Sequence, residues 1–586
     1  MSKINDVSLI IGTANGSGSQ SANLILLRSI FRMGIPVGGK NLFPSNIAGL
    51  PTWFVIRASE KGYTSILPKM NIVVAVNQQT CDDDMAHLDS ESLFIHNSSL
   101  RFTKPLPVNS LSVDFTKLAS QVTDSIKLKK LLTNIVYVGV LAEMLGIPDD
   151  ILQKTIGDQF NNKKSVVDLN VAAATVGREH YKNHIKLASP WRLEPRQHNN
   201  GKILIDGNTA AGLGSVFAGC SFASWYPITP SSSLAESFES YCQKLRKNKN
   251  GENNYSVIQA EDELSAITMV AGAGWAGARA MTATSGPGIS LMAETAGLMY
   301  FAEIPGVVWN VQRAGPSTGL PTRTLQGDIV ACAQLSHGDT QHPLLLPATP
   351  EECFSMAQTA FDLAERLQTL VFVLSDLDLG MNQWISNDFT YSQKPFDRGK
   401  VLSAEALEKA QQFNRYKDID GDGIPYRTLP GTEHNLAGYF TRGTGHDESA
   451  KYTENADVFQ KLLERLSKKW QTAKTLVPEP VIDIQTSALG LIAYGSTDAS
   501  IRELRDMLLQ KGVKASYLRL KAYPFTASVE NYLKTHDKIV VLEQNRDGQM
   551  RKLLLQEFPE HAIKIKSSLS YDGWPTRAEN LMAGVV

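Results

Sequence analysis

The sequence predicts an α/β protein built from several doubly wound domains. Short apolar runs recur along the chain, and each is followed by a glycine-rich loop and a helix, which is the pattern of strand–helix–strand units. The 586 residues give room for about three or four such domains. The apolar fraction of 42% is too high for a disordered chain. We therefore expect a folded protein with more than one hydrophobic core.

The first domain is expected over residues 1–186. It opens with an apolar strand, Val7–Ile11, followed by the turn-rich loop GTANGSGSQ from Gly12 and then by a helix. The domain ends near Lys186, where SPWRLEPRQHNN has the composition of a linker. The apolar residues of that first helix, which we expect to be buried, are Leu24, Leu26, Leu27, Ile30 and Phe31. Further elements of this domain are expected at Asn71–Val76, a strand, and at Ser120–Leu145, a helical region.

The rest of the chain predicts a second domain over 201–379, an irregular connector over 380–477 and a last domain over 478–586. In the second domain, the strands GVVWNV and TLVFVLS alternate with helices rich in small residues. One such helix, from about Leu264 to Ala280, has Ala and Gly on most faces, so we expect it to be buried. The connector ends in the amphipathic helix VFQKLLERLSKKW, and the last domain reads β-α-β through ALGLIAYG, YLRL and KIVVLEQN.

Charge and hydropathy exclude several classes of protein. The chain has 58 Lys and Arg against 59 Asp and Glu, a net charge of -1, so it lacks the basic excess that binds nucleic acid or an anionic membrane. The longest apolar stretch, IVYVGVLAEMLGI from Ile135, is shorter than the roughly 20 residues that span a bilayer. No targeting segment is visible at the N-terminus. We expect a cytoplasmic protein whose partners are small molecules or neutral surfaces.

The number and spacing of the five cysteines bear on metal binding. They are scattered, with no CxxC pair that would begin a zinc or iron–sulfur site, and an odd, sparse set is typical of reduced thiols. We therefore expect no metal on this chain. If the protein transfers electrons, its metal centre should lie on another chain.

Two glycine-rich segments have alternative interpretations. The GTANGSGSQ loop could bind a phosphate group, because it follows a strand and precedes a helix, but it matches neither the dinucleotide fingerprint nor a Walker A loop. A plain turn is the other interpretation. The Asp418–Asp422 loop contains GDG and resembles half of a calcium loop, yet Leu429 stands where the bidentate Glu should be. We interpret it as a hydrated acidic turn.

The most informative constellation lies in the second domain. In WYPITPSSS, from Trp225, two prolines flank Ile228 and Thr229, which favours an extended backbone that presents the Thr229 hydroxyl. QAEDE from Gln259 begins the small-residue helix, and the loops TSGPG from Thr284 and QRAGPSTGLPT from Gln312 follow later strands. Each residue alone has a structural explanation, for example acids at a helix start. Together they predict a ligand site at the carboxyl ends of parallel strands.

In their order and spelling, these motifs resemble the α subunit of the 2-oxoacid:ferredoxin oxidoreductases, and QRAGPSTGLPT is most similar to the 2-oxoglutarate branch. GTANGSGSQ together with FPSNIAGLPTWFVIRAS (Phe43–Ser59) resembles the γ domain of these enzymes, fused ahead of α. IAYGSTDAS and VLEQNRDGQM resemble the family's transketolase C-terminal-like domain. The resemblance thus implies a γ domain over 1–186, a thiamine-diphosphate pyrimidine-binding domain over 201–379 and a transketolase C-terminal-like domain over 478–586.

The resemblance also implies cofactors and partners. Thiamine diphosphate would be shared with a β subunit that carries the GDG motif, Mg2+ and the [4Fe-4S] cluster, in an (αβ)2 assembly. The implied reaction is the oxidative decarboxylation of 2-oxoglutarate with coenzyme A to succinyl-CoA and CO2, with electrons passed to ferredoxin. Pyruvate or a branched-chain 2-oxoacid remains an alternative substrate. The direction also stays open between the citric acid cycle and reductive CO2 fixation. A non-catalytic nucleotide-binding scaffold is the alternative from another class.

Roles for individual residues follow from the same resemblance. A carboxylate should contact the pyrimidine N1' of the cofactor; Glu263, nine residues before Gly272, fits the family register better than Glu261, eleven before it. Arg313 should bind the substrate carboxylate through two oxygens. The substrate pocket is implied to include Thr229, Thr322 and, more weakly, Arg323 for a distal carboxylate. The cofactor site is implied to include Tyr226, Pro227, Ile228, Thr229, Ser285 and Gly286.

Overall fold

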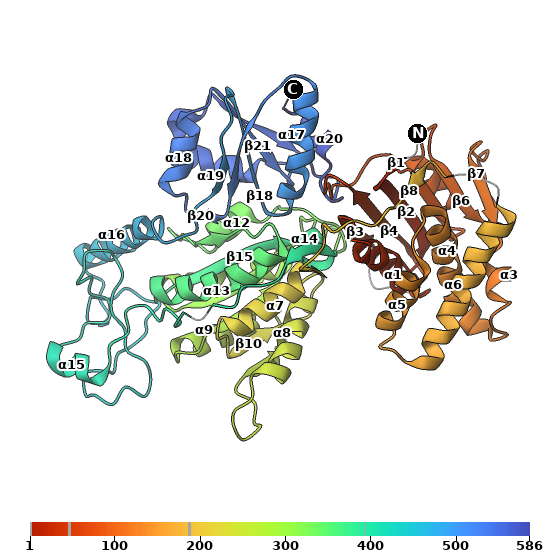
Figure 1. The fold of residues 1–586 in the computed structure, drawn as a ribbon. Coiled ribbons are helices and arrows are strands. Elements are labelled where there is room, and N and C mark those ends of the chain that lie inside the picture. Colours follow the sequence, from red (N-terminus) through yellow and green to blue (C-terminus); the bar gives the residue numbers. More distant parts are fainter. Residues whose placement is uncertain (1–2, 45–48, 186–188, 393, 586) are drawn as a thin grey trace. The chain divides into compact units, whose positions relative to one another are not determined.

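The computed structural model of the chain describes residues 3–44, 49–185, 189–392 and 394–585 (Figure 1). Part of the Phe43–Ser59 motif, Ser45 to Ala48, and the predicted domain end at Lys186 lie outside the described residues. The chain forms two compact units. Unit 1 comprises residues 1–205, 382–388 and 575–578, and unit 2 comprises residues 206–381, 389–574 and 579–586.

Unit 1 is built on a mixed six-stranded sheet. The expected strand at Val7–Ile11 lies within β2 (Asp6–Ala14), and the one at Asn71–Val76 contains β5 (Ile72–Ala75). Both are buried, as strands in the middle of a sheet should be. β5, β6 and β7 run parallel to β2, whereas β3 and β4 complete the other side in antiparallel pairing. The order is β3 (Val37–Leu42), β4 (Pro51–Ser59), β2, β5, β6 (Leu93–Asn97), β7 (Ser110–Val113).

The helices of unit 1 follow from local sequence signals. α1 (Ser19–Arg32) buries Leu26, Leu27 and Ile30, while Leu24 and Phe31 are partly buried against the same core. The predicted helical region from Ser120 begins only at Ile126, because the Ser125 hydroxyl caps the amide of Leu128 at 3.4 Å. The long helices that follow are α4 (Ile126–Leu145), α5 (Asp149–Gln159) and α6 (Lys164–His184), and the unit also has two short ones, α2 (Cys81–Asp84) and α3 (Phe115–Ala119).

Unit 2 contains a seven-stranded sheet and a five-stranded sheet. The first is parallel apart from its edge strand β20 (Ala522–Tyr523), which pairs antiparallel with β14 (Leu344–Leu345) although about 180 residues separate them in the chain. The order in the first sheet is β11 (Ser256–Gln259), β10 (Phe222–Trp225), β12 (Ala280–Thr284), β13 (Gly306–Gln312), β15 (Leu370–Asp376), β14, β20. The division of this unit at residues 379 and 478 stays a prediction.

The small-residue helix of unit 2 departs from expectation in two ways. The helix α9 (Glu263–Trp275) ends five residues early, and residues up to Ala280 lead into the buried strand β12. It is also not buried all round: Leu264, Met269 and Trp275 expose 46%, 39% and 38% of their surface. The sequence pattern missed this because alanine and glycine suit a close helix–strand contact and an exposed face equally well.

The C-terminal sheet confirms the predicted β-α-β pattern. β18 (Leu489–Tyr494), β19 (Ser516–Leu520) and β21 (Lys538–Glu543) are parallel, as is β22 (Ile565–Leu569), whereas β17 (Val481–Asp483) is an antiparallel edge. The helices α17 (Ile501–Gln510), α18 (Ala527–Lys534) and α19 (Gln549–Glu557) link these strands. Residues 481–569 therefore form a second, smaller doubly wound element.

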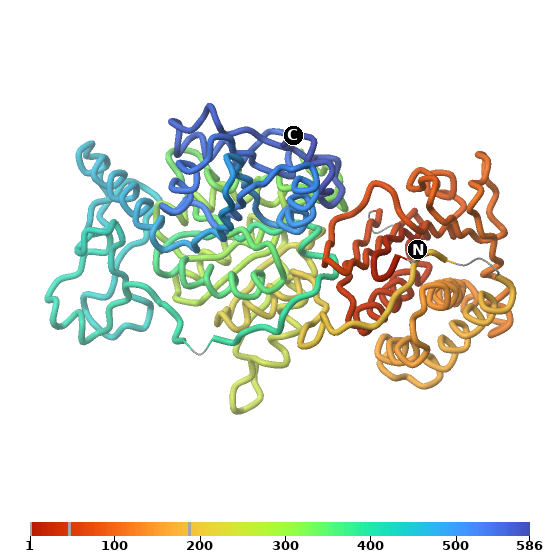
Figure 2. Tube along the Cα trace, turned by 45° about the horizontal axis from the view of Figure 1, so that its top comes forward, coloured from red at the N-terminus to blue at the C-terminus, as the bar shows by residue number. Residues whose placement is uncertain are grey.

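Between the two sheets, the connector has little regular structure, and Figure 2 shows its irregular path. A short helix, α15 (Ala404–Ala410), precedes the predicted amphipathic helix, which spans Ala456–Ala473 (α16). The Asn455 side chain caps α16 through the amides of Asp457 and Val458. In the part of the chain that the structure describes, no helix is long and apolar enough to cross a bilayer.

Candidate functional site

The predicted site residues gather at one edge of the seven-stranded sheet. β10, β11, β12 and β13 are parallel, so their carboxyl ends lie at the same edge, where ligands of α/β proteins bind. Tyr226, Pro227, Ile228 and Thr229 follow β10; Glu261 and Glu263 follow β11; Ser285 and Gly286 follow β12; Arg313 follows β13. Thr322 and Arg323 lie later in the loop that begins at Arg313.

The two candidate glutamates differ in burial. Glu261 is exposed, whereas Glu263, the first residue of α9, is 7% exposed and lies against the TSGPG loop: a Cβ atom at Gly288 would be 2.9 Å from Glu263 Cγ. The helix start is already capped by Asp262, whose carboxylate accepts the amide of Ser265 at 2.7 Å. Among the described residues, none forms a hydrogen bond or ion pair with the Glu263 carboxylate. A buried acid without a partner is costly, so this group is suited to a ligand.

Arg313 is the second group of the site. It is 8% exposed, and its Nη1 donates a hydrogen bond to the carbonyl oxygen of Thr229 at 2.7 Å. Its buried Nε–H has no partner among the described residues. Burial lowers the pKa of the guanidinium, and the nearby Asp328 carboxylate opposes that shift. A desolvated guanidinium with a free donor is a site for a carboxylate.

The segment around Thr229 leads from β10 into the next helix. The strand ends at Trp225, and Thr229, Pro230 and Ser231 form a turn that leads into α8 (Ser232–Leu245), with the Ser231 amide bonded to the Ile228 carbonyl. As a result, the Thr229 carbonyl holds Arg313, while its hydroxyl makes no hydrogen bond to a described residue.

A cavity of about 500 Å³ opens beside Arg313. Gly286 lines it, and the partly buried Asp328 carboxylate lies against Gly286, 3.0 Å from the Asn310 amide that donates to it. The opposite wall comes from the C-terminal sheet, through Asn545, Arg546, Asp547, Gln549 and Tyr571. Neither Asp328 nor these C-terminal residues were predicted from the sequence, because no local pattern indicates that the ends of the two sheets meet.

Other predicted residues surround this cavity without lining it. The Ser285 hydroxyl is fully buried and has no partner among the described residues. Thr322 is 7% exposed and its carbonyl accepts Arg323 Nη1 at 2.9 Å, so Arg323 is folded back on its own loop. Burial lowers the pKa of Arg323. Arg313 and Gly286 therefore line the same cavity, whereas Thr322 and Arg323 are not among its lining residues.

The GTANGSGSQ loop borders a different cavity, inside unit 1. It connects β2 to α1, and Gly16 and Gly18 have φ values of 77° and 83°. The cavity, about 410 Å³, is lined by this loop together with Lys129 and Lys130 of α4. Lysines beside a strand-to-helix loop keep the phosphate interpretation open as a prediction.

The Asp418–Asp422 turn is neutralised from within the chain. The Asp418 carboxylate accepts the backbone amides of Gly421, Asp422 and Gly423, while Lys400 Nζ lies 2.7 Å from Asp420 and 2.8 Å from Asp422. An ammonium group thus stands where a bound cation would stand. Within the described ranges there is no group of three or more His, Cys, Asp or Glu side chains that could hold a metal ion.

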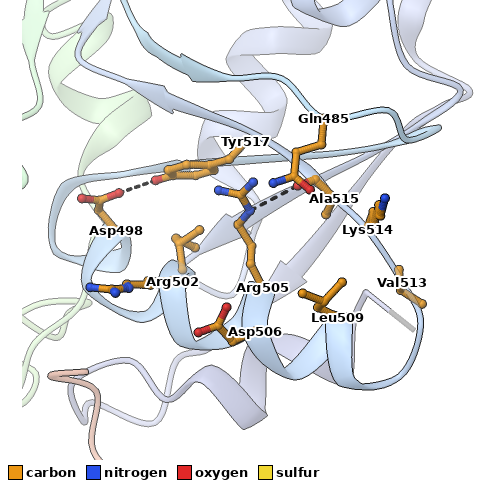
Figure 3. Close-up of a pocket in the computed structure, with 11 residues that line it drawn as sticks. Gln485, Asp498, Arg502, Arg505, Asp506, Leu509, Val513, Lys514, Ala515 and Tyr517 are labelled. Atoms are coloured by element: carbon orange, nitrogen blue, oxygen red, sulfur yellow. Dashed lines mark hydrogen bonds between the residues drawn. The ribbon is translucent and has the colours of Figure 1, made fainter. Parts of the chain in front are cut away.

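A third cavity, about 330 Å³, lies in the C-terminal sheet beside α17 (Figure 3). Arg505 donates to the Ala515 carbonyl and pairs with Asp483, and Tyr517 donates to Asp498. None of the predicted site residues lines it. Its cations are already partly paired, so it does not match the site that the motifs predict.

Two family models match the sequence. "Pyruvate ferredoxin/flavodoxin oxidoreductase" matches residues 8–180, and "Pyruvate flavodoxin/ferredoxin oxidoreductase, thiamine diP-bdg" matches residues 214–393. The second match contains all the site residues that the motifs predicted.

Individual proteins are similar over most of the chain. The 2-oxoacid:ferredoxin oxidoreductase 2, subunit alpha, of Aeropyrum pernix is 28% identical and covers 94% of this chain and 92% of its own length. The 2-oxoglutarate synthase subunit KorA of Archaeoglobus fulgidus is 35% identical over 60% of this chain and 89% of its own. A solved 2-oxoglutarate:ferredoxin oxidoreductase from Magnetococcus marinus, with 2-oxoglutarate, coenzyme A and succinyl-CoA bound, is 26% identical, with a TM-score of 0.87 over 99% of both chains.

Proposed function

The chain belongs to the 2-oxoacid:ferredoxin oxidoreductases, enzymes that acylate coenzyme A, as an α subunit with a γ-type region at its N-terminus, and we propose that its substrate is 2-oxoglutarate. The proposed reaction converts 2-oxoglutarate and coenzyme A to succinyl-CoA and CO2, with electrons passed to ferredoxin. The observation that carries the proposal is that a buried acid without a protein partner, Glu263, and a buried arginine that lines a cavity, Arg313, both follow parallel strands at one edge of the seven-stranded sheet.

The residues present fit the pyrimidine half of thiamine diphosphate. Glu263 is 7% exposed and its carboxylate has no protein partner, and the fully buried Ser285 hydroxyl nearby in the TSGPG loop has none either, so the protein leaves these polar groups available to a cofactor. When bound, thiamine diphosphate supplies the carbanion stabilisation that decarboxylation requires. We propose that Glu263, rather than Glu261, contacts the pyrimidine N1', because Glu261 is exposed. The turn Tyr226–Thr229 and the TSGPG loop would form the walls of the cofactor site.

Arg313 is proposed to bind the carboxylate next to the 2-oxo carbon. Arg313 lines the cavity, the hydrogen bond to the Thr229 carbonyl holds the guanidinium in position, and its burial strengthens the attraction to an anion. Thr229 and Thr322 would complete the pocket. Arg323 remains a proposal for the distal carboxylate, and it would have to release the Thr322 carbonyl to reach it.

A β subunit is proposed to cover the exposed side of this site. Next to Glu263, the outer face of α9 and the neighbouring helices α10 (Gly286–Leu291) and α11 (Ala293–Phe301) expose apolar side chains that a folded protein ordinarily covers. These are Leu264, Met269, Trp275, Leu291 and Leu298. We propose that the β subunit brings the diphosphate site with Mg2+ and the [4Fe-4S] cluster, in an (αβ)2 assembly. The cytoplasmic location and the direction of the reaction stay predictions.

The test of substrate class uses the native complex isolated through an affinity tag on this chain. Ferredoxin reduction is measured with 2-oxoglutarate, pyruvate and a branched-chain 2-oxoacid, each with coenzyme A. We expect kcat/KM for 2-oxoglutarate to exceed the other two by about tenfold or more, since a site that pairs a second carboxylate rejects acids lacking it. An equal or higher kcat/KM for pyruvate would show that the chemistry is right and the substrate wrong.

A further inference from the structure

Two C-terminal motifs, AYGST and LEQN, have no role in the reaction described so far. They stand at the carboxyl ends of β18, the central strand of the five-stranded sheet, and of its neighbour β21. In the structure both converge on one residue of the other sheet's loops, Gln326. This residue lies in the loop that starts with Arg313, three positions after Arg323 and two before Asp328.

Gln326 is 1% exposed, and each of its polar groups is bonded. Its Nε2 donates to Asp376 Oδ2 at 3.0 Å, and its Oε1 accepts the Thr497 hydroxyl at 3.2 Å. Its backbone amide donates to the Gln544 carbonyl at 2.8 Å, and its carbonyl accepts Asn545 Nδ2 at 3.1 Å. Three of these four partners come from the C-terminal motifs.

The close packing around Gln326 also restricts which residue can stand at position 495. Gly495 has a φ of 56°, and a Cβ atom there would lie 2.6 Å from Gln326 Nε2. Only glycine is compatible with both the left-handed backbone and this approach. The glycine of the AYGST motif is therefore explained by the position of the Gln326 amide.

A second layer of hydrogen bonds makes the contact rigid. Ser496 donates to Asp376 at 2.6 Å, and Gln544 Nε2 donates to Ser496 at 2.8 Å and to Thr497 at 3.0 Å. All of these side chains are buried. Apart from the buried Gln544 Oε1, which has no partner among the described residues, the polar side-chain atoms named here are hydrogen-bonded, and a displacement would leave more of them without partners.

The loop held in this way carries the groups that face the cavity. Its two arms are joined by the Ala314 amide, which donates to the Arg323 carbonyl at 2.9 Å, so the position of one end determines that of the other. Arg313 and Asp328 line the cavity at the two ends of the loop, whereas Gln326 does not line it. Asn545, which holds Gln326, lines it from the other side.

We propose that Gln326 is a positioning residue, through which the C-terminal sheet fixes the Arg313–Asp328 loop for binding of the 2-oxoacid. The expected effect on KM rests on the proposed function. The expected effect on the rigidity of the loop rests on geometry alone. It gives the C-terminal sheet a task in catalysis without any residue of AYGST touching substrate.

The kinetic test uses the native complex carrying Q326E, D376N or both. In Q326E the new Glu carboxylate faces the Asp376 carboxylate, to which the Gln326 amide donates in the unmodified chain. We expect the repulsion to shift the loop. KM for the 2-oxoacid should then rise by about tenfold to a hundredfold, with a smaller change in kcat. D376N replaces one of the two acceptor oxygens of Asp376 with an NH2 donor, so that the bonds to Gln326 and to the Leu379 amide cannot both be kept, and KM rises similarly. In the double variant the new Asn amide donates to the new Glu carboxylate, so KM returns to within about threefold of the original value.

Q334E is the matched control, since Gln334 is exposed and bonds only Gln556 on the surface. A purely structural role would reduce the amount of folded complex and leave KM of the folded fraction unchanged. An unchanged KM in both single variants, or a double variant no better than Q326E, would overturn the proposal.

Hydrogen–deuterium exchange separates this proposal from the proposed function. We expect residues 313–328 to exchange faster in Q326E than in the unmodified complex or Q334E. If the unmodified complex turned over no 2-oxoacid, the proposed function would fail, and the exchange result would still decide the positioning role: unchanged protection of 313–328 in Q326E would rule it out.

Discussion

At the scale of single residues, the structure separates two glutamates that the sequence left as rivals. We expect E263Q to abolish 2-oxoacid decarboxylation, by about a thousandfold or more, because the amide cannot replace a carboxylate that stabilises a protonated ring nitrogen. E261Q is the matched control and should retain near-normal turnover, since Glu261 is exposed. The measurement is ferredoxin reduction by complexes shown to contain both subunits. Near-normal turnover of E263Q would refute the assignment.

Arg313 offers a second test at this scale. R313K keeps the charge but loses the planar pair of donors and the bond to the Thr229 carbonyl. We expect KM for the 2-oxoacid to rise by about tenfold or more, with thiamine diphosphate affinity unchanged. The KM comes from initial rates and the cofactor affinity from calorimetry. If KM stayed the same, the anchor of the substrate carboxylate would have to be another residue.

Asp84 in unit 1 predicts a pH dependence of stability. Its carboxyl is 1% exposed, accepts Trp53 Nε1 at 2.7 Å and the Thr80 hydroxyl at 3.1 Å, and burial raises its pKa to about 7. The folded state holds this proton more tightly than the unfolded state does. The resulting contribution of Asp84 to the free energy of unfolding is therefore fully present below about pH 4. It is lost as the pH rises to about 7.

The variant D84N, which imitates the protonated acid, should lack this dependence. Urea unfolding of the full chain between pH 4 and 8 should show D84N gaining up to about 4 kcal/mol relative to the unmodified chain as the pH rises. A constant difference across that range would mean that Asp84 is ionised throughout. Asp83 is the exposed acid next to Asp84 and supplies the control: D83N should keep the pH dependence of the unmodified chain.

At the scale of elements, the connector helix α16 is held by one buried acid. Glu303 is 1% exposed and pairs with Arg465 at 2.5 Å and Lys469 at 2.9 Å, both on α16. Burial alone would raise the pKa of Glu303, but these two cations lower it to about 2. The acid therefore stays ionised, and its stabilising effect is lost only as the pH falls towards that value.

We expect E303Q to destabilise the chain by about 3–5 kcal/mol, because it leaves two buried cations without their counter-ion. Chemical unfolding at neutral pH measures this loss. E464Q, on the exposed side of the same helix, should change stability by less than about 0.5 kcal/mol. Equal effects of the two substitutions would contradict the anchoring role of Glu303.

Elements with a strong local signal were predicted, and those decided by distant pairing were not. The alternation of apolar strands and capped helices located β2, α1, β13, β15 and α16. Residues 280–284, AMTAT, look equally suited to the end of a helix, and only pairing with β10 and β13 makes them a strand. β20 has two residues and no signal of its own. Asp328 and Asn545 were missed for the same reason, since they meet through the packing of two sheets.

At the scale of the whole molecule, the exposed face of α9 predicts where assembly can be broken. L264K places a charge on this face and should prevent co-purification of the β subunit, because a buried unpaired charge costs several kcal/mol at an interface. L245K, at the end of α8, changes an equally exposed leucine elsewhere on the unit. It should leave the complex intact. Size-exclusion chromatography of both variants makes the comparison, and a normal L264K complex would exclude this face as the interface.

Unit 1 has a further consequence for the order in which the chain folds during synthesis. Its members include residues 382–388 and 575–578, and β16 (Trp384–Asn387) pairs with β9 (Lys202–Ile205) within it. Lys40 Nζ lies 3.3 Å from the centre of the Trp384 ring, and the Asn41 amide donates to Asn382. On the ribosome, an N-terminal region is made first, yet β9 must wait for residue 387 before it has a partner. The unit whose residues are translated first is thus among the last to be completed, since it includes residues 575–578.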